Sequence, residues 1–250
     1  MRQHLALQTL VVIIDGSVVG RGCVALMMHV AYKGRALPLV WQGRKGKQGH
    51  CPEDMPRTLV EQLHALIPPG AQVVLLGDGA CDGTQLQQKV QEYDWSYVVR
   101  TGSHSTVEWE GERFRCETGA ACIKPGTLVA LNDVRVTEEA YGPLMLLCRW
   151  AKGSKDPLYL LTNMEAADAA CRLDAKRFCL ETFFSDQKNR GFHLHQSPLS
   201  DPTRLTRLLM AACLAYLWII YLGALCEQDG WVSDVALLYR THGDKSNRYP

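Results

Sequence analysis

Three carboxylates stand where a functional site could bring them together. Asp15 follows one apolar run that predicts a buried strand, and Asp78 follows another. A glycine comes directly after each of them, which lets a ligand or substrate approach the backbone closely. Open α/β sheets deliver functional groups at the carboxyl ends of their strands. Either aspartate alone could simply cap a turn or a helix, but two acids in the same strand–Asp–Gly context favour a shared site.

The third carboxylate, Glu181, lies in a segment that we expect to be helical. Arg177 lies four residues before Glu181 and Lys188 lies seven residues after it, so all three share one helix face. We expect the opposite face to be aromatic, with Phe178, Phe183 and Phe184. An ordinary amphipathic helix with an ion pair would explain this spacing. It would not explain the two acids that follow strands.

These motifs, taken in order, resemble those of DDE transposases of the insertion-sequence-four group. The run Asp174-x-x-Arg177-x-x-x-Glu181, with Lys188 seven residues on, is similar to the group's Tyr-Arg-Glu-Lys signature. Asp174 stands in the place of the signature tyrosine and puts a negative charge where a phosphate contact is expected.

Two earlier regions carry the same resemblance. Residues 30–39, which follow the strand with Asp15, are similar to the group's opening hairpin. Residues 75–79, followed by residues 97–100, resemble its second-aspartate region. The resemblance spans roughly residues 7–225.

The resemblance implies a ribonuclease-H-like α/β fold, in which helices flank a mixed sheet and a β-rich insertion precedes the last catalytic helix. It also implies that Asp15, Asp78 and Glu181 are catalytic and hold two divalent cations, Mg²⁺ or Mn²⁺, for which oxygen ligands are suited. Two such ions, about 3.5–4 Å apart, clamp the attacking and leaving oxygens of a phosphoryl displacement. Water would then nick the DNA at an insertion-sequence end, and the freed 3′-OH would attack a target strand.

The same resemblance assigns DNA contacts. Arg177 and Lys188 would hold phosphates of the element's end, and Arg100 would support the same site. Asp82 lies close to Asp78 in sequence, but Asp78 directly follows the strand and is the better candidate. Two tryptophans of the insertion could stack on a flipped base, although a core role is more common for such residues. They are Trp109 and Trp150.

The expected partners are double-stranded DNA, as element ends and target, and a second copy of the chain when assembled on DNA. No small-molecule cofactor is expected. The formal net charge is only +1, whereas DNA-binding proteins usually carry a basic excess. Relatives usually carry a DNA-recognition region before the first aspartate, so we expect a truncated or inactive copy. The scattered cysteines show no zinc-ligand spacing and are expected to be reduced, mostly buried thiols of a cytoplasmic protein.

The expected organisation has four parts: the first part of the catalytic domain (1–100), a β-rich insertion (101–161), the catalytic and apolar C-terminal helices (162–228) and a tail (229–250). The first part is expected to contain an antiparallel meander and then a βαβ unit. The expected strands are 7–14, 23–30, 31–41, 72–76 and 95–100. The expected helices are 52–66, 82–93, 164–188 and 202–225.

Residues 208–225 form an uncharged apolar stretch at the short end of the range for a membrane span. A buried core or interface helix is the favoured interpretation. Two functional alternatives remain beside the transposase. One is a metal-dependent nuclease of the same fold, and the other is a non-enzymatic protein with one membrane-associated helix.

Overall fold

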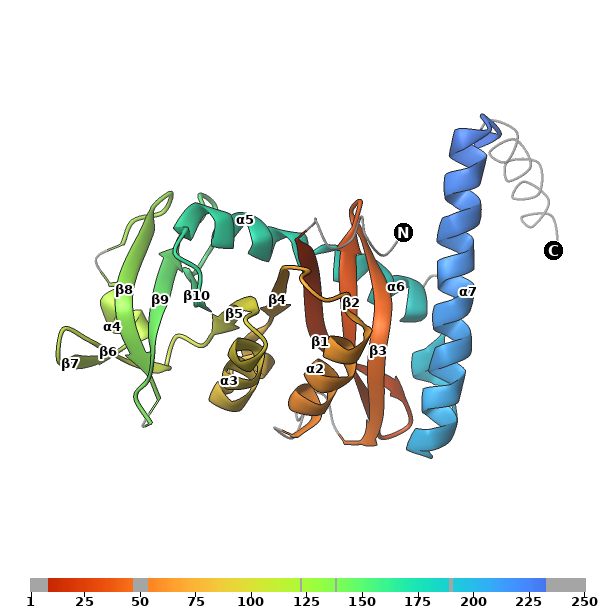
Figure 1. The fold of residues 1–250 in the computed structure, drawn as a ribbon, viewed down its shortest axis with the longest axis horizontal. Coiled ribbons are helices and arrows are strands. Elements are labelled where there is room, and N and C mark those ends of the chain that lie inside the picture. The colour runs from red at the N-terminus through yellow and green to blue at the C-terminus, as the bar shows by residue number, and fades with distance from the viewer. Residues whose placement is uncertain (1–8, 47–53, 122, 138, 189–190, 233–250) are drawn as a thin grey trace, which may run out of the picture. The chain divides into compact units, whose positions relative to one another are not determined.

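The computed structural model describes residues 9–46, 54–121, 123–137, 139–188 and 191–232. In these residues ten strands form one sheet in the order β3-β2-β1-β4-β5-β10-β9-β8-β6-β7 (Figure 1). The strands are β1 (Leu10–Gly20), β2 (Cys23–Tyr32), β3 (Arg35–Lys45), β4 (Val73–Gly77), β5 (Ser96–Thr101), β6 (Thr106–Trp109), β7 (Glu112–Arg115), β8 (Leu128–Val136), β9 (Tyr141–Arg149) and β10 (Leu158–Thr162). The helices are α2 (Asp54–Leu66), η1 (Gly79–Cys81), α3 (Thr84–Glu92), α4 (Cys116–Gly119), α5 (Ala167–Lys176), α6 (Cys179–Lys188), η2 (Leu194–Gln196) and α7 (Pro202–Gln228).

The first three strands form the expected antiparallel meander. Strand β2 pairs with β1 on one side and with β3 on the other. The turn between β2 and β3 uses Lys33 and Gly34, whose φ angles are 46° and 74°. Two positive φ angles in a two-residue loop match the twist of a hairpin, and glycine adopts such an angle without strain. The predicted turn at residues 33–35 is therefore confirmed.

The expected βαβ unit is also present. Strand β4 pairs in parallel with β1, and β5 pairs in parallel with β4 through the crossover helix α3. Strand β4 is buried along its whole length, as expected for a parallel strand with both faces covered. The predicted mixed sheet flanked by helices is confirmed.

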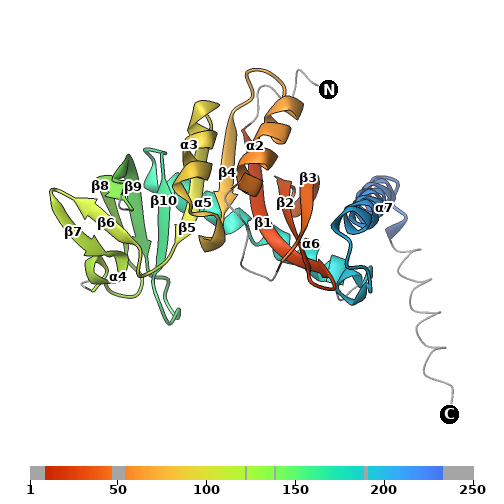
Figure 2. The ribbon, with the colours of Figure 1, turned by 90° about the horizontal axis from the view of Figure 1, so that it is seen from below.

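Side chains of the sheet alternate between two covered faces. Val12, Ile14, Leu75 and Val99 belong to a core cluster that also contains residues of α2 and α3, including Leu59. The opposite face carries His29, whose ring packs edge-on against Phe183 of α6, with ring centroids 4.5 Å apart. Helices α2 and α3 thus lie on one face of the sheet and α6 on the other (Figure 2).

The strands within residues 101–162, where a β-rich insertion was expected, extend the same sheet instead of forming a layer of their own. Strand β10 pairs antiparallel with β5, and β9, β8, β6 and β7 continue outward from β10. Leu160 of β10 lies opposite Arg100 of β5. Backbone hydrogen bonds therefore connect the insertion directly to a strand that we expect to carry a site residue.

The two end strands of the sheet are β3 and β7. Strand β3 contains Pro38, which lies opposite His29 next to a change of register, and proline cannot donate a ladder hydrogen bond. Strand β7 has only four residues, three of them charged: Glu112, Arg113 and Arg115.

The predicted helix over residues 164–188 is wrong in one respect, because it is two helices. Helix α5 ends at Lys176 and α6 begins at Cys179. Between them the backbone makes shorter-range hydrogen bonds, from Arg177 N to Asp174 O and from Leu180 N to Arg177 O, both 3.0 Å. Such i to i−3 bonds tighten the chain as a 3₁₀ turn does. Arg177 and Phe178 therefore form a short joint between the two helices.

The chain divides into two units, Met1–Thr206 and Arg207–Pro250. In the first unit, the beginning of α7 packs closely on two glycines. A Cβ on Gly20 would lie 2.8 Å from Leu205, and one on Gly43 would lie 2.7 Å from the hydroxyl of Thr206. Larger residues at these positions would push this first turn away.

Helix α7 is long and apolar enough to cross a membrane by length and composition, which is weak support for a span. It was expected to be a core or interface helix. Within the described residues, 22% of its apolar window is buried, so that window does not form a core helix. Its exposed side chains include Met210, Leu214, Trp218, Ile219, Tyr221 and Leu222.

Candidate active site

Asp15 and Asp78 lie side by side at the same level of two neighbouring parallel strands. Ile14 of β1 pairs with Gly77 of β4, and the two aspartates are the next residues. Neighbouring strands are about 4.8 Å apart, and side chains at one level point to the same face. The expectation that the two acids meet at one edge of the parallel strands is consistent with this register.

Arg100 extends the same row by one strand. Gly77 also pairs with Val99 of β5, so the residue after Val99 lies level with Asp78. Three charged side chains, Asp15, Asp78 and Arg100, therefore cross three adjacent parallel strands on the face opposite the α2–α3 core. Asp15 was predicted to follow the end of a strand, and that prediction is wrong. Strand β1 runs on to Gly20 because its antiparallel pairing with β2 continues, as at Ser17 and Ala25.

Strand β4, in contrast, ends at Gly77, and the chain turns away beside Asp15. Asp78 caps the short helix η1, where its Oδ1 accepts a hydrogen bond of 3.0 Å from the backbone N–H of Ala80. Gly77 leaves little room just before it, since a Cβ there would lie 3.0 Å from Cys81 and 3.2 Å from Val99.

The two aspartates interact electrostatically. Burial, followed by the negative charge of Asp78, raises the pKa of Asp15 to about 6. The backbone N–H of Gly16, which donates to Oδ1 of Asp15 at 2.7 Å, and the charges of Arg177 and Lys188 act in the opposite direction. A carboxylate that is costly to ionise beside a second carboxylate is suited to a bound cation.

Arg177 reaches this pair from the joint between α5 and α6. Its Nη1 lies 3.6 Å from Oδ2 of Asp15, and the two side chains are only 13% and 19% exposed. Glu181 is exposed in the first turn of α6. Its charge, like that of Asp78, contributes to the raised pKa of Arg100. The charges of Asp15, Asp78, Arg177, Arg100 and Glu181 therefore interact with one another, directly or through a shared neighbour.

Asp174, which the resemblance aligns with the signature tyrosine, does not present a free negative charge. Its buried carboxylate accepts two hydrogen bonds from Arg100, of 3.0 Å from Nε and 2.9 Å from Nη2. This ion pair is the largest cause of the raised pKa of Arg100. The guanidinium carbon also lies 5.8 Å from the ring centre of Phe178. Phe178 was expected on one helix face with Phe183 and Phe184, but it lies between α5 and α6 and is exposed, whereas Phe183 is buried.

Lys188 lies at the other end of α6, with its Nζ 5.6 Å from the ring centre of Phe184. The charge of Lys188 lowers the pKa of Asp15, so this lysine acts on the same carboxylate. The tryptophans considered for base stacking, Trp109 and Trp150, are half-buried and pack against the main core cluster.

Asp82 takes part in a separate polar network. Its Oδ2 accepts a hydrogen bond of 2.9 Å from the hydroxyl of Thr101, which lies 2.8 Å from the hydroxyl of Ser105. Burial raises the pKa of Asp82. Its Thr101 partner alternates with Arg100 along β5, so Asp82 is held on the other side of the sheet from Asp15. The preference for Asp78 as the second site aspartate agrees with this geometry.

Sequence reasoning missed His29. This histidine belongs to β2, lies opposite Ile13 of β1 and is completely buried. Burial lowers its pKa to about 3, so the ring is neutral. Its contacts with Phe183 and Phe184 hold α6 against the face that carries Asp15. Only the aromatic spacing on α6 hinted that such a partner was needed.

No group of three His, Cys, Asp or Glu side chains in the described ranges is close enough to hold a metal ion. Asp15 and Asp78 nevertheless fit a divalent cation, because both offer hard oxygen ligands and their charges repel each other. The predicted third ligand, Glu181, lies on the helix that covers the same face.

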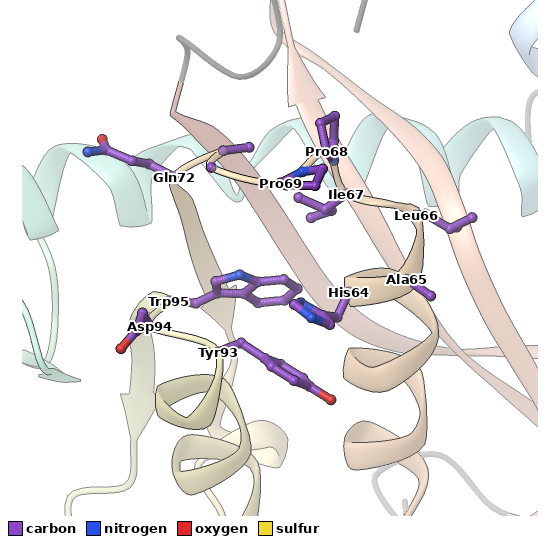
Figure 3. Close-up of a pocket in the computed structure, with 12 residues that line it drawn as sticks. His64, Ala65, Leu66, Ile67, Pro68, Pro69, Gln72, Tyr93, Asp94 and Trp95 are labelled. Carbon is purple, nitrogen blue, oxygen red and sulfur yellow. The ribbon is translucent and has the colours of Figure 1, made fainter. Parts of the chain in front are cut away.

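A cavity of about 680 Å³ lies elsewhere, where β4 and β5 begin (Figure 3). His64 of α2 stacks on Tyr93 there, with ring centroids 3.8 Å apart and planes inclined by 3°, next to Trp95. Because Trp95 precedes β5 whereas Arg100 is near the strand's end, this cavity is separate from the row of charges.

The fold and the row of charges define a ribonuclease-H-like α/β domain with paired strand carboxylates. The family model described as transposase DDE domain matches residues 7–218, and the chain belongs to this family. The narrower insertion-sequence-four group stays a prediction. No curated protein matches the sequence.

Solved structures give distant likenesses. The piggyBac transposase, in a synaptic complex with hairpin DNA, is 14% identical with a TM-score of 0.49, over 81% of this chain and 44% of that one. The NurA nuclease from Sulfolobus solfataricus is 10% identical with a TM-score of 0.40, over 82% of this chain and 84% of that one. Endonuclease V from Ciona intestinalis, in complex with DNA, is 14% identical with a TM-score of 0.40, over 72% of this chain and 86% of that one. The chain thus spans less than half of the piggyBac protein.

Proposed function

We propose that this chain is a transposase catalytic core that cleaves DNA strands at insertion-sequence ends and joins them to target DNA. The observation that carries the proposal is the level placement of Asp15 and Asp78 on neighbouring parallel strands. Family membership supplies the class of reaction. Double-stranded DNA is the proposed partner, and two copies are proposed to act together on it.

Asp15, Asp78 and Glu181 are the residues that would hold two Mg²⁺ or Mn²⁺ ions. Such ions stabilise the attacking and leaving oxygens of an in-line displacement at phosphorus. The chain's own task is to hold these carboxylates on a rigid sheet and helix. Arg177 and Lys188 would bind DNA phosphates beside them. Arg100, already paired with Asp174, would add positive charge to the site without contacting DNA through those donors.

Cation binding tests the site directly. Mn²⁺ is expected to raise the melting temperature of the wild-type protein, and the increase should be lost in Asp15→Ala and Asp78→Ala. Asp82→Asn serves as the comparison, because this carboxylate belongs to the Thr101 network. It should keep the Mn²⁺ response. An equal response in wild type and Asp15→Ala would refute the metal site.

Cleavage is tested with duplexes that carry the ends of the insertion sequence encoding the chain. Metal-dependent nicks confined to those ends, followed by joining to a second duplex, are expected for a transposase. Equal nicking of unrelated duplexes without joining would instead identify a nuclease.

A further inference from the structure

The two arginines near the carboxylates are held very differently. Arg100 donates two short hydrogen bonds to buried Asp174. Arg177 approaches Asp15 only to 3.6 Å, which is beyond hydrogen-bond distance. Its Nε is buried and has no hydrogen-bond partner among the residues that the structure describes. Arg100 is therefore fixed, whereas Arg177 is loosely held and has donors to spare.

We propose that Arg177 is a displaceable internal cation, which neutralises Asp15 until a divalent cation binds and then turns to a DNA phosphate. This inference rests on the proposed function, since it concerns the same site. Arg177 then has two successive partners, Asp15 and a DNA phosphate, whereas the proposed function gives it only the phosphate.

Competition at Asp15 follows from the use of its two oxygens. Oδ1 accepts the hydrogen bond from Gly16, and Oδ2 faces the guanidinium of Arg177. A divalent cation bound to Oδ2 would lie close to that guanidinium, in a setting where both side chains are largely removed from water. Like charges repel strongly at such separations. The metal ion and the guanidinium therefore cannot occupy this oxygen together at low energy.

The backbone around Arg177 departs from regular helix, which is consistent with the exchange. The residue lies at the joint between α5 and α6, where 3₁₀-type hydrogen bonds replace those of a regular helix. A guanidinium released from Asp15 presents a planar set of N–H donors, which suits the oxygens of a phosphate.

Binding of metal and binding of DNA are then coupled. Both favour the state in which Arg177 has left Asp15, so each strengthens the other by the same factor. DNA is expected to raise the Mn²⁺ affinity of the wild-type protein by about fivefold or more, within the usual range of such coupling.

The test measures Mn²⁺ affinity by thermal shift, with and without a short DNA duplex. Arg177→Gln removes the competitor, so Mn²⁺ alone should bind about fivefold more tightly than in wild type, and DNA should add little further affinity. Lys176→Gln is the matched control, because it removes a positive charge from the exposed side chain next to Arg177. It should change Mn²⁺ affinity less and keep the effect of DNA.

An equal gain of Mn²⁺ affinity in Lys176→Gln and Arg177→Gln would overturn the proposal, since the loss of any positive charge in this region would then explain both. A wild-type affinity that DNA does not change would overturn it too. If Arg177→Gln does not fold, Arg177→Met, which also removes the charge, replaces it, and a DNA effect as large as that of wild type would contradict the proposal. If the wild-type protein binds no Mn²⁺ at all, with or without DNA, the proposed function itself is refuted.

Discussion

The guanidinium of Arg100 forms two hydrogen bonds, of 3.0 and 2.9 Å, with the carboxylate of Asp174. The pair joins β5 to α5 across 74 residues of sequence. It explains how an acid can stand where the resemblance predicts a tyrosine: its charge is neutralised inside the protein. The carboxylate is 4% exposed and the guanidinium side chain 23%.

Replacing Asp174 should therefore destabilise the fold. Asp174→Ala leaves a partly buried guanidinium without its partner, which we expect to lower the free energy of unfolding by about 2–4 kcal/mol. Urea denaturation measures the loss. Asp168→Ala is the control, because it removes an exposed carboxylate from the same helix and should cost less than about 1 kcal/mol. Equal losses of unfolding free energy in the two variants would show that the ion pair with Arg100 does not stabilise the fold more than an exposed carboxylate does.

The raised pKa of Asp15 predicts a pH-dependent stability. The folded-state pKa is about 6 and the ordinary value is 3.8, so ionisation of this acid is costlier in the folded protein. Stability associated with protonated Asp15 is complete below about pH 4 and is lost as the pH rises through 6. Asp15→Asn cannot ionise. It should thus be more stable than wild type at pH 7.5, by about 2–3 kcal/mol at most.

The difference between Asp15→Asn and wild type should shrink steadily from pH 6 to pH 4 in metal-free buffer. Denaturation in urea across this range measures it. Saturating Mn²⁺ should reverse the order at pH 7.5, because only the carboxylate gains from a cation. A difference that is independent of pH would assign the effect to packing and would contradict the raised pKa.

Glu181 offers a test that separates activity from stability. Its side chain is exposed at the beginning of α6, so Glu181→Gln should change the free energy of unfolding by less than about 0.5 kcal/mol. Metal-dependent DNA cleavage should fall by about a hundredfold or more, as when one group that stabilises transition-state charge is lost. Rates of nicking under single-turnover conditions give the comparison. Unchanged cleavage would remove Glu181 from the catalytic set.

Gly77 should be essential to the position of Asp78. An alanine Cβ would meet Cys81 at 3.0 Å and Val99 at 3.2 Å, and overpacking of this kind costs about 1–3 kcal/mol. We expect Gly77→Ala to lower the melting temperature and also the Mn²⁺ affinity. Gly83→Ala is the control, since its Cβ would enter open space. If both variants bind Mn²⁺ as wild type does, the close packing before Asp78 does not position the carboxylate.

Local patterns predicted much of this fold. Alternating and apolar runs gave the meander and the βαβ unit, and the two Asp–Gly pairs marked the positions that the sheet brings level. The extent of β1 was not predictable, because Asp15 stays in a strand only through its pairing with β2. The joint at Arg177 and the pairing of Arg100 with Asp174 also depend on tertiary contacts between distant segments. Spacing along a helix carries no information about either.

The end strands of the sheet limit how copies of this chain can assemble. Pro38 withholds a donor on one side, and the short, charged β7 resists alignment with another strand on the other. Continuous β-sheet between molecules, and the fibrous aggregation that can grow from it, is disfavoured at both borders. Two copies brought together on one DNA molecule would therefore recognise each other through side chains or through the DNA itself.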